Sequence, residues 1–520
     1  MRIIDNKVLL VETREPAAIL DAVQKSALME NHKGVSKIAV HWGLKEAQAL
    51  TALGMDDVPS PILRDYKWTG KHTPFAHQKT TASFLTVNRK AFCFSEAGTG
   101  KTASVIWSAD YLMNKKKVKR VLVLCPLSIM KAAWQTDLFK FAMHRSCSVA
   151  HGSAEQRRKI IDAGSEFVVI NFDGVAVVED EIKAGGFDLI VVDEATAYKN
   201  AQTSRWKVLN RIIKETNPRL WMLTGTPAAQ SPLDAYGLAK LVNPEGCPRN
   251  YNLFRDSVMY RITQFKWGVK PQAKTIVHQM LQPAIRFEKS QCLDLPQVTH
   301  TEREAPLTPQ QKKYYKLLKE QMIMEAAGEE VSAVNAATKL NKLLQISGGA
   351  VYSDNREVVQ FDVSNRINVV LEAIEETSRK VLVFVPFTHT IELLRDALEK
   401  EKISCDVING KVNLNKRSDI VARFQSDPDP RVLLIQPQAA SHGLTLTEAD
   451  TIIWYAPVTS VETYLQANAR IDRPGQKHAM TIVHITGSDV EAKLYKMLRG
   501  NIENHQQIID LYRQEILQTA

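Results

Sequence analysis

"AFCFSEAGTGKTASVIWSADYL" (91–112) places a glycine-rich turn between a short apolar run and a pattern typical of a helix. The full phosphate-loop pattern requires glycine at the position of Ser95, and that glycine is missing. Gly100-Lys101-Thr102 alone is a weak signal in a chain of 520 residues. The surrounding sequence must therefore decide whether this turn binds phosphate.

The context of the turn favours a phosphate loop. "AFCFS" (91–95) predicts a strand and "TASVIWSADYL" (102–112) predicts a helix, so the turn precedes a helix N-terminus, where backbone N–H groups and the helix dipole attract anions. Lys101 would reach the β- and γ-phosphates, and Thr102 would hold Mg²⁺. The candidate ATP-binding residues of the loop are Ala97, Gly98, Thr99, Gly100, Lys101 and Thr102.

Two acidic residues end a second apolar run, "LIVVDEATAYKN" (189–200). A carboxylate at a strand tip beside a phosphate loop can hold Mg²⁺, which is the role we expect for Asp193. Glu194 would orient or deprotonate the attacking water. An isolated Asp-Glu pair is more often a solvated turn, but the order of strand, loop, helix and acidic strand end favours catalysis.

Short runs rich in Val, Ile and Leu alternate with helical patterns in two series. The first series comprises 91–95, 120–126, 166–171, 189–194 and 219–225, and the second comprises 380–386, 431–437, 451–456 and 480–485. Continuous apolar runs are typical of parallel sheets that helices cover on both faces. The two series therefore predict two α/β lobes.

The remaining segments predict two further parts. "TPQQKKYYKLLKEQMIMEAA" (308–327) predicts a helix that begins at Thr308. The segment 1–65 contains two strand-like runs, each followed by a helix-like stretch, and predicts a small accessory domain. We expect domain boundaries at 1–65, 66–290 for the ATP-binding lobe, and 291–520 for the second lobe with its helical insertion.

Composition restricts the partners and the compartment. The formal net charge is +10, which suits a polyanionic partner such as nucleic acid, although a merely soluble basic protein explains it equally well. The six cysteines are dispersed, so they indicate a reducing compartment and no zinc cluster. No signal peptide or apolar run of about 18 residues is present, so we expect no membrane partner.

We expect a cytoplasmic protein of a bacterium or a phage-infected host cell. "KKKVKR" (115–120) is similar to a nuclear-localisation run, but an exposed turn between helix and strand explains it better.

A basic segment in the second series, "YLQANARIDRPGQ" (464–476), predicts the start of a helix that carries Gln466, Arg470 and Arg473. Arg470 and Arg473 are three residues apart and share one helix face. Two guanidinium groups directed at one place suit the charge that develops on a transferring phosphoryl group. Alone, the segment would be interpreted as a basic surface helix.

Together these segments resemble the SNF2 (Swi2/Snf2) family of superfamily 2 nucleic-acid motors, over about 70–515. The motifs follow the family's order: "TPFAHQ", "SEAGTGKT", "LCPLSIMKAAWQTDLFKF", "VVDEATAYKN", "LTGTPAAQSPLDAYGL", "VLVFVPFTHTIELL", "QAASHGLTLTEAD" and "QANARIDRPGQ". "DLPQVTHTEREAPLTPQQKKYYKLL" is similar to the entry into the family's helical insertion. Within the family, the chain resembles small phage or bacterial members and the annealing-helicase (HARP-like) branch.

The resemblance implies an α/β fold with two RecA-like lobes, parallel sheets covered by helices, a helical insertion and a small N-terminal α+β domain. It implies that ATP binds between the lobes, with Gln78 on the adenine. Lys101, Asp193 and Glu194 would act from the first lobe, and Gln466, Arg470 and Arg473 from the second. DNA, duplex or branched, would contact the protein largely without sequence preference, through Ser128, Lys131, Thr224 and Thr445. We expect a monomer.

The chain departs from the family pattern at three motifs. Thr196 replaces the usual His after the acidic pair, Ala440 and Ser441 replace a common Gly pair that precedes Gly443, and Ala469 replaces a common Gly. None of these changes removes a catalytic group, so we expect an active ATPase.

The leading hypothesis is a DNA-dependent ATPase that translocates on duplex DNA and remodels or anneals branched DNA in replication, recombination or repair. A strand-separating superfamily 2 helicase on DNA or RNA is the alternative. A catalytically silent DNA-binding scaffold is a third hypothesis.

Overall fold

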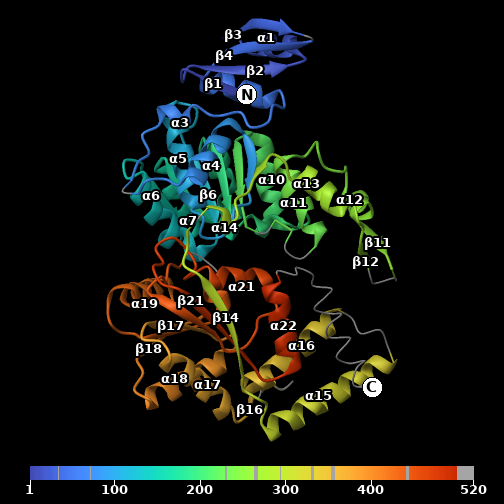
Figure 1. The fold of residues 1–520 in the computed structure, drawn as a ribbon, viewed down its shortest axis with the longest axis vertical. Coiled ribbons are helices and arrows are strands. Elements are labelled where there is room, and N and C mark those ends of the chain that lie inside the picture. The colour runs from blue at the N-terminus through green and yellow to red at the C-terminus, as the bar shows by residue number, and fades with distance from the viewer. Residues whose placement is uncertain are drawn as a thin grey trace. The chain divides into compact units, whose positions relative to one another are not determined.

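The protein is described by a computed structural model that covers residues 1–32, 34–70, 72–225, 227–228, 231–262, 267–292, 294–328, 333–352, 358–440 and 444–500 (Figure 1). The chain divides into two compact units. The first unit comprises Met1–Ala228 and Pro232–Leu293, and the second comprises Ala229–Ser231 and Asp294–Ala520. Each unit has its own parallel sheet and its own hydrophobic cores.

The N-terminal part of the first unit is a four-stranded antiparallel sheet with strand order β1-β2-β4-β3. Its elements are β1 (Arg2–Ile4), β2 (Val8–Thr13), α1 (Pro16–Ala22), β3 (Ser26–His32), β4 (Val35–His41) and α2 (Leu44–Ala52). Alternate residues of β2 and β4 pack with α1 and α2 in one core. The two strand-like runs expected here are confirmed as β2 and β4, whereas β1 and β3, whose residues are mostly exposed, were not anticipated.

The central sheet of the first unit has seven parallel strands in the order β13-β5-β10-β9-β6-β8-β7. The strands are β5 (Lys90–Cys93), β6 (Val121–Cys125), β7 (Cys147–Ala150), β8 (Phe167–Asn171), β9 (Leu189–Asp193), β10 (Arg219–Leu223) and β13 (Ala284–Ile285). Consecutive strand residues alternate between two separate cores, for example Ala91 in one and Phe92 in the other. Both faces of this sheet are therefore buried, as the apolar runs predict.

Helices cover both faces of the seven-stranded sheet (Figure 1). They are α3 (Ile62–Asp65), α4 (Ala76–Val87), α5 (Lys101–Asn114), α6 (Thr136–Phe141), α7 (Ala154–Asp162), α8 (Phe172–Val175), α9 (Glu179–Ala184), α10 (Ser204–Thr216), α11 (Ala235–Val242), α12 (Tyr251–Val258) and α13 (Ala273–Met280). The short helix α14 (Lys289–Cys292) follows β13 and has no buried residue. A short antiparallel hairpin of β11 (Met259–Arg261) and β12 (Trp267–Val269) follows α12.

The second unit contains a six-stranded parallel sheet with order β14-β21-β20-β17-β19-β18. The strands are β14 (Val298–Glu304), β17 (Lys380–Phe384), β18 (Cys405–Ile408), β19 (Val432–Ile435), β20 (Ala449–Trp454) and β21 (Met480–Thr486). The helices that accompany this sheet are α17 (Ser364–Glu375), α18 (Thr388–Lys400), α19 (Leu414–Ser426), α20 (Pro437–Ala440), α21 (Val461–Asn468) and α22 (Asp489–Arg499).

Along the chain, a helical insertion lies between β14 and the other strands of this sheet. It comprises α15 (Pro309–Gly328) and α16 (Ala333–Gly348), followed by a hairpin of β15 (Ala350–Tyr352) and β16 (Val358–Gln360). Thr308 caps α15 as expected, because its Oγ1 accepts from the Gln311 backbone and its own N–H donates to the Gln311 side chain at 2.9 Å.

A buried arginine, paired with a glutamate, joins the insertion to the sheet of the second unit. Arg366 on α17 donates to Glu491 on α22 at 2.7 Å, and the two side chains are 2% and 0% exposed. Arg366 also donates to the carbonyls of Ser347 on α16 and Ile485 on β21. These bonds satisfy a charge that would otherwise be costly to bury.

The expected fold class is confirmed: two parallel α/β lobes, a helical insertion and an N-terminal α+β part. The boundaries expected at 65/66 and 290/291 stay predictions. All six cysteines are free. Among the described residues, no helix is long and apolar enough to cross a bilayer, and no group of three or more metal-ligating side chains occurs.

Candidate nucleotide-binding site

The phosphate loop joins β5 to α5 in the first unit. Gly98 and Gly100 have φ values of +86° and +77°, a region that glycine adopts without strain. At Gly100, an added Cβ would also overlap the Nε2 atom of Gln78. Ser95 is not among the residues with positive φ, so its backbone does not require the glycine of the consensus pattern. The missing glycine is therefore compatible with a phosphate loop.

Lys101 begins α5 and lies over the loop. Its Nζ donates to the backbone carbonyls of Ser95 at 2.6 Å and Glu96 at 3.0 Å. These carbonyls hold the ammonium group inside the loop that Gly98 and Gly100 shape. The positive charge, the glycine backbone and the N-terminus of a 14-residue helix together fit the phosphates of ATP.

Gln78 lies at the start of α4 and is 8% exposed. Its side-chain oxygen accepts from the Phe75 backbone at 2.9 Å, and its Nε2 lies 3.4 Å from the Thr99 carbonyl. His77 Nε2 lies 2.8 Å from the same carbonyl, a contact that no sequence pattern predicts. Both side chains thus hold α4 against the phosphate loop, and the adenine role of Gln78 stays a prediction.

Asp193 is the last residue of β9 and receives two hydrogen bonds. Trp134 Nε1 donates to one carboxylate oxygen at 2.9 Å, and the Glu194 backbone donates to the other at 3.1 Å. Burial raises the pKa of Asp193, while the nearby charge of Lys101 opposes that rise. The sheet register places Asp193 at the same edge of the sheet as the phosphate loop, because Cys93 and Asp193 both pair with Leu223 of β10, and a cation such as Mg²⁺ would favour the ionised form of Asp193.

Glu194 has a left-handed backbone, with φ of +54° and ψ of +56°. Non-glycine residues adopt this conformation at a cost of about 1–2 kcal/mol, and such strain concentrates at functional sites. The chain then turns through Ala195–Tyr198, and Lys199 Nζ lies 3.3 Å from Asp234. This ion pair and the bond from the Gly237 N–H to the Lys199 carbonyl connect the acidic segment to the motif "LTGTPAAQSPLDAYGL".

The arginine pair lies in the second unit. Arg470 and Arg473 each donate one Nη1 to the carbonyl oxygen of Leu444, at 3.1 and 3.0 Å. The expectation that the arginines share one helix face is wrong, because α21 ends at Asn468 and both residues lie in the turns that follow; the shared acceptor is what brings their guanidinium groups to one place. Arg470 Nε also donates to the Gln466 carbonyl, and the Gln466 side chain donates to Glu462 at 3.2 Å. Their roles toward ATP stay predictions.

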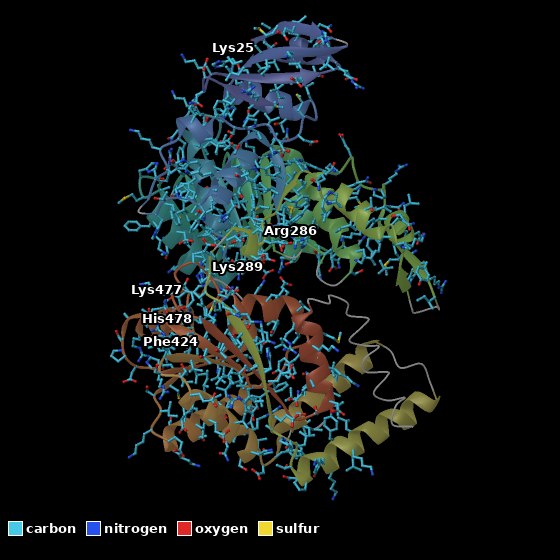
Figure 2. All side chains as sticks on the ribbon, viewed as in Figure 1. Lys25, Arg286, Lys289, Phe424, Lys477 and His478 are labelled. Atoms are coloured by element: carbon cyan, nitrogen blue, oxygen red, sulfur yellow. The ribbon has the colours of Figure 1, made fainter. Side chains whose placement is uncertain are left out.

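Gln476, next to the arginine segment, anchors it to β20. Its Nε2 donates to the Ala449 carbonyl at 2.8 Å, and its Oε1 accepts from the backbones of Lys477 and His478, which Figure 2 labels. The side chain is 6% exposed. Sequence reasoning treated this glutamine only as a family signature and missed its structural role.

The four candidate DNA contacts differ in exposure. Ser128 is partly exposed and Lys131 is exposed, and both lie on the segment that follows β6. Thr445 is partly exposed beside Leu444. Thr224 is 1% exposed, which argues against a direct phosphate contact in this conformation. All four stay predictions, and the departure at Ser441 and the retained Gly443 lie outside the described residues.

Family models match both halves of the chain. The model of the SNF2-related domain matches residues 40–348, and the model of the helicase conserved C-terminal domain matches residues 365–475. Because the first match covers more than half of the 520 residues, the chain belongs to the SNF2-related family. It carries the helicase-like ATP hydrolase core of that family, and the family resemblance is confirmed.

The relatives are distant and mostly longer. Chromodomain-helicase-DNA-binding protein 1-like of Mus musculus is 25% identical over 80% of this chain and 47% of its own length. An ATP-dependent helicase of Mycoplasma genitalium is 26% identical over 75% of this chain and 37% of its own. The protein p41 of Acyrthosiphon pisum secondary endosymbiont phage 1 is 24% identical over 80% of this chain and 93% of its own. The chain thus spans less than half of the first two.

Among solved structures, the Sulfolobus solfataricus SWI2/SNF2 ATPase core in complex with dsDNA is 23% identical, with a TM-score of 0.41. The alignment covers 85% of this chain and 94% of that chain.

Proposed function

We propose that this protein is a DNA-dependent ATPase that translocates on duplex DNA and remodels or anneals branched DNA. The observation that carries the proposal is the sheet register: Cys93, just before the phosphate loop, and Asp193, at the carboxyl end of β9, both pair with Leu223 of β10. In parallel α/β sheets, ligands bind outside the carboxyl ends of the strands. Membership of the SNF2-related family adds the motor class.

The substrate ATP would be held by the loop residues Ala97 to Thr102, with Gln78 on the adenine. Thr102 and Asp193 would hold Mg²⁺, which would neutralise charge on the phosphates. Lys101 would leave its two carbonyl partners and bind the β- and γ-phosphates. Glu194 would orient or deprotonate the attacking water.

Gln466, Arg470 and Arg473 would complete the site when the two units close. The arginines would exchange the Leu444 carbonyl for the charge that develops on the γ-phosphate. Nucleic acid that binds both units would favour closure and so stimulate hydrolysis. Repeated closing and opening would move the protein along DNA.

DNA is the partner that the charge favours. The chain carries 67 Lys and Arg against 57 Asp and Glu. The mouse relative is named as a DNA-binding protein. We further propose a role in replication, recombination or repair in a bacterial or phage-infected cytoplasm, which suits six free cysteines and a phage relative.

The test is ATP turnover at low salt without DNA and with linear duplex or forked DNA. We expect strong stimulation by DNA, and near-total loss of turnover in Lys101→Ala and Glu194→Gln. Absence of stimulation by every DNA would refute the proposal. A DNA-dependent turnover that Lys101→Ala abolishes would eliminate the silent scaffold.

Two further measurements separate the remaining alternatives. Strand displacement on forked DNA and on RNA duplexes tests the strand-separating helicase, which robust unwinding would favour.

Deletion of 1–65, followed by comparison of ATPase stimulation by linear and by branched DNA, tests whether the N-terminal part selects branched DNA. A selective loss of stimulation by branched DNA is the expected result.

A further inference from the structure

The chain that leaves the first unit runs along the phosphate loop before it enters the second. β13 adds to β5 as a parallel edge strand, and the Phe94 N–H donates to the Ile285 carbonyl at 2.8 Å. The following residues reach α14, and the chain passes to the second unit at Asp294. Figure 2 labels Arg286 and Lys289 on this segment. The exit of the chain is thus part of the sheet edge beside the loop.

Two side chains of the loop hold this segment, in an arrangement that we name the linker clasp. The Phe287 N–H donates to Ser95 Oγ at 3.1 Å, and the Lys289 N–H donates to a Glu96 carboxylate oxygen at 2.9 Å. The Glu96 N–H donates in return to the Phe287 carbonyl at 3.1 Å. Ser95 is 2% exposed, so its hydroxyl is shielded from water. Glycine at this position would remove the first of these bonds.

One peptide unit belongs to both the clasp and the lysine site. The oxygen of the Ser95–Glu96 peptide accepts from Lys101 Nζ at 2.6 Å, and the N–H of the same peptide donates to Phe287. Hydrogen bonds on the two ends of a peptide strengthen each other, because each one polarises the unit. When phosphates draw Lys101 away, the bond from Glu96 to the Phe287 carbonyl would weaken, so the clasp would open more often and expose the Phe287 N–H to exchange.

We propose that the linker clasp couples occupancy of the phosphate loop to the course of the chain between the two units. Ser95 and Glu96 are positioning residues in this role, because they act through Phe287 and Lys289. The inference deepens the proposed function, on which it rests, by naming the contact that transmits nucleotide binding toward closure. Ser95, the departure from the phosphate-loop pattern, then has a specific task.

The first test is amide hydrogen exchange of residues 284–292, without DNA and without turnover. In the wild type, the non-hydrolysable analogue AMP-PNP with Mg²⁺ is expected to accelerate exchange at Phe287. Ser95→Ala is expected to accelerate exchange at Phe287 about five-fold without nucleotide, the effect of losing one neutral hydrogen bond. Unchanged exchange at Phe287 on saturation with AMP-PNP, or in Ser95→Ala, would overturn the proposal.

The second test measures how the variants change KM for ATP and DNA-stimulated kcat. Ser95→Ala and Glu96→Ala are expected to lower DNA-stimulated kcat about five-fold, with KM for ATP within two-fold of wild type. Glu96→Gln keeps an acceptor oxygen and is expected to retain most of the activity. Wild-type kcat in both alanine variants would overturn the coupling.

Ser148→Ala is the matched control. Ser148 lies on β7, the edge strand at the opposite side of the sheet from β13, and its hydroxyl bonds to Ser165 Oγ at 2.6 Å. We expect neither exchange at Phe287 nor kcat to change in this variant. If Ser148→Ala reproduced the effects of Ser95→Ala, a general structural role would replace the coupling. Failure of the proposed function appears separately, as a wild type without DNA stimulation, because the exchange test needs no turnover.

Discussion

Two independent features disfavour a side chain at Gly100. Its φ of +77° is unfavourable for any other residue, and a Cβ would overlap Gln78 Nε2. We predict that Gly100→Ala loses stability by more than the approximately 1 kcal/mol that a left-handed alanine costs, and that it weakens ATP binding. Thermal unfolding and nucleotide titration measure the two effects.

Gly54→Ala separates these features. Gly54 has a φ of +81°, but no atom lies within 4 Å of the position of a Cβ. The Gly54→Ala variant is expected to lose only the stability that a left-handed alanine costs and to bind ATP normally. Equal losses in the two variants would show that the overlap with Gln78 has no effect.

His484 makes the second unit sensitive to acid. Burial lowers its pKa to about 3, and His300 and Arg499 act in the same direction, while Tyr464 OH lies 2.9 Å from its Nε2. The unfolded chain binds a proton near pH 6.5 and the folded chain does not. The contribution of His484 to the free energy of unfolding is therefore full above about pH 6.5, and it is lost as the pH falls toward 3.

The measurement is urea unfolding at a series of pH values between 7.5 and 5. We expect His484→Gln to flatten the decline in stability, which reaches at most about 1.4 kcal/mol per pH unit for one proton. His478→Gln, at an exposed position labelled in Figure 2, is the control and should leave the profile unchanged. A wild-type profile in His484→Gln would contradict the assignment.

The guanidinium group of Arg366 connects four elements through its hydrogen bonds: α16, α17, α22 and β21. Arg366→Met would leave the Glu491 carboxylate buried without its partner, which costs about 3–5 kcal/mol. Thermal unfolding should show a clear drop, and the double variant Arg366→Met with Glu491→Leu should recover much of it, because no charge then stays buried. Lys159→Met breaks an exposed pair with Glu155 and should change stability by less than about 0.5 kcal/mol.

Which strands could be predicted depends on their place in the sheets. Every central strand of the two parallel sheets appears as a continuous apolar run in the sequence. The four strands of these two sheets that were not anticipated, β7, β13, β14 and β18, are their edge strands. An edge strand is buried less completely, so β14 reads "VTHTERE" and carries no apolar run.

The residues of the site can also be separated into those that the sequence predicts and those that it does not. The loop glycines, Lys101, Asp193 and Glu194 follow from local order along the chain, because a strand, a turn and a helix place them. The bond from Trp134 to Asp193 and the linker clasp join segments 59 and 192 residues apart. Such contacts depend on tertiary packing, which no local pattern encodes.

For the whole molecule, we predict a strong salt dependence of DNA binding. A protein that neutralises roughly six to ten phosphates loses on the order of 10³–10⁵ in affinity between about 50 and 200 mM salt. The DNA concentration for half-maximal ATPase stimulation, measured over this range, should rise accordingly, while turnover at saturating DNA changes little. A flat dependence would show that phosphate contacts do not dominate.

The six free cysteines have a practical consequence for handling the protein. Burial raises the pKa of all six thiols, that of Cys147 to about 11, so few thiolates exist at neutral pH. Alkylating reagents and peroxide attack the thiolate, so these side chains should react slowly. A fluorophore could then be attached at an engineered surface cysteine with little competition, which would allow single-molecule observation of movement along DNA.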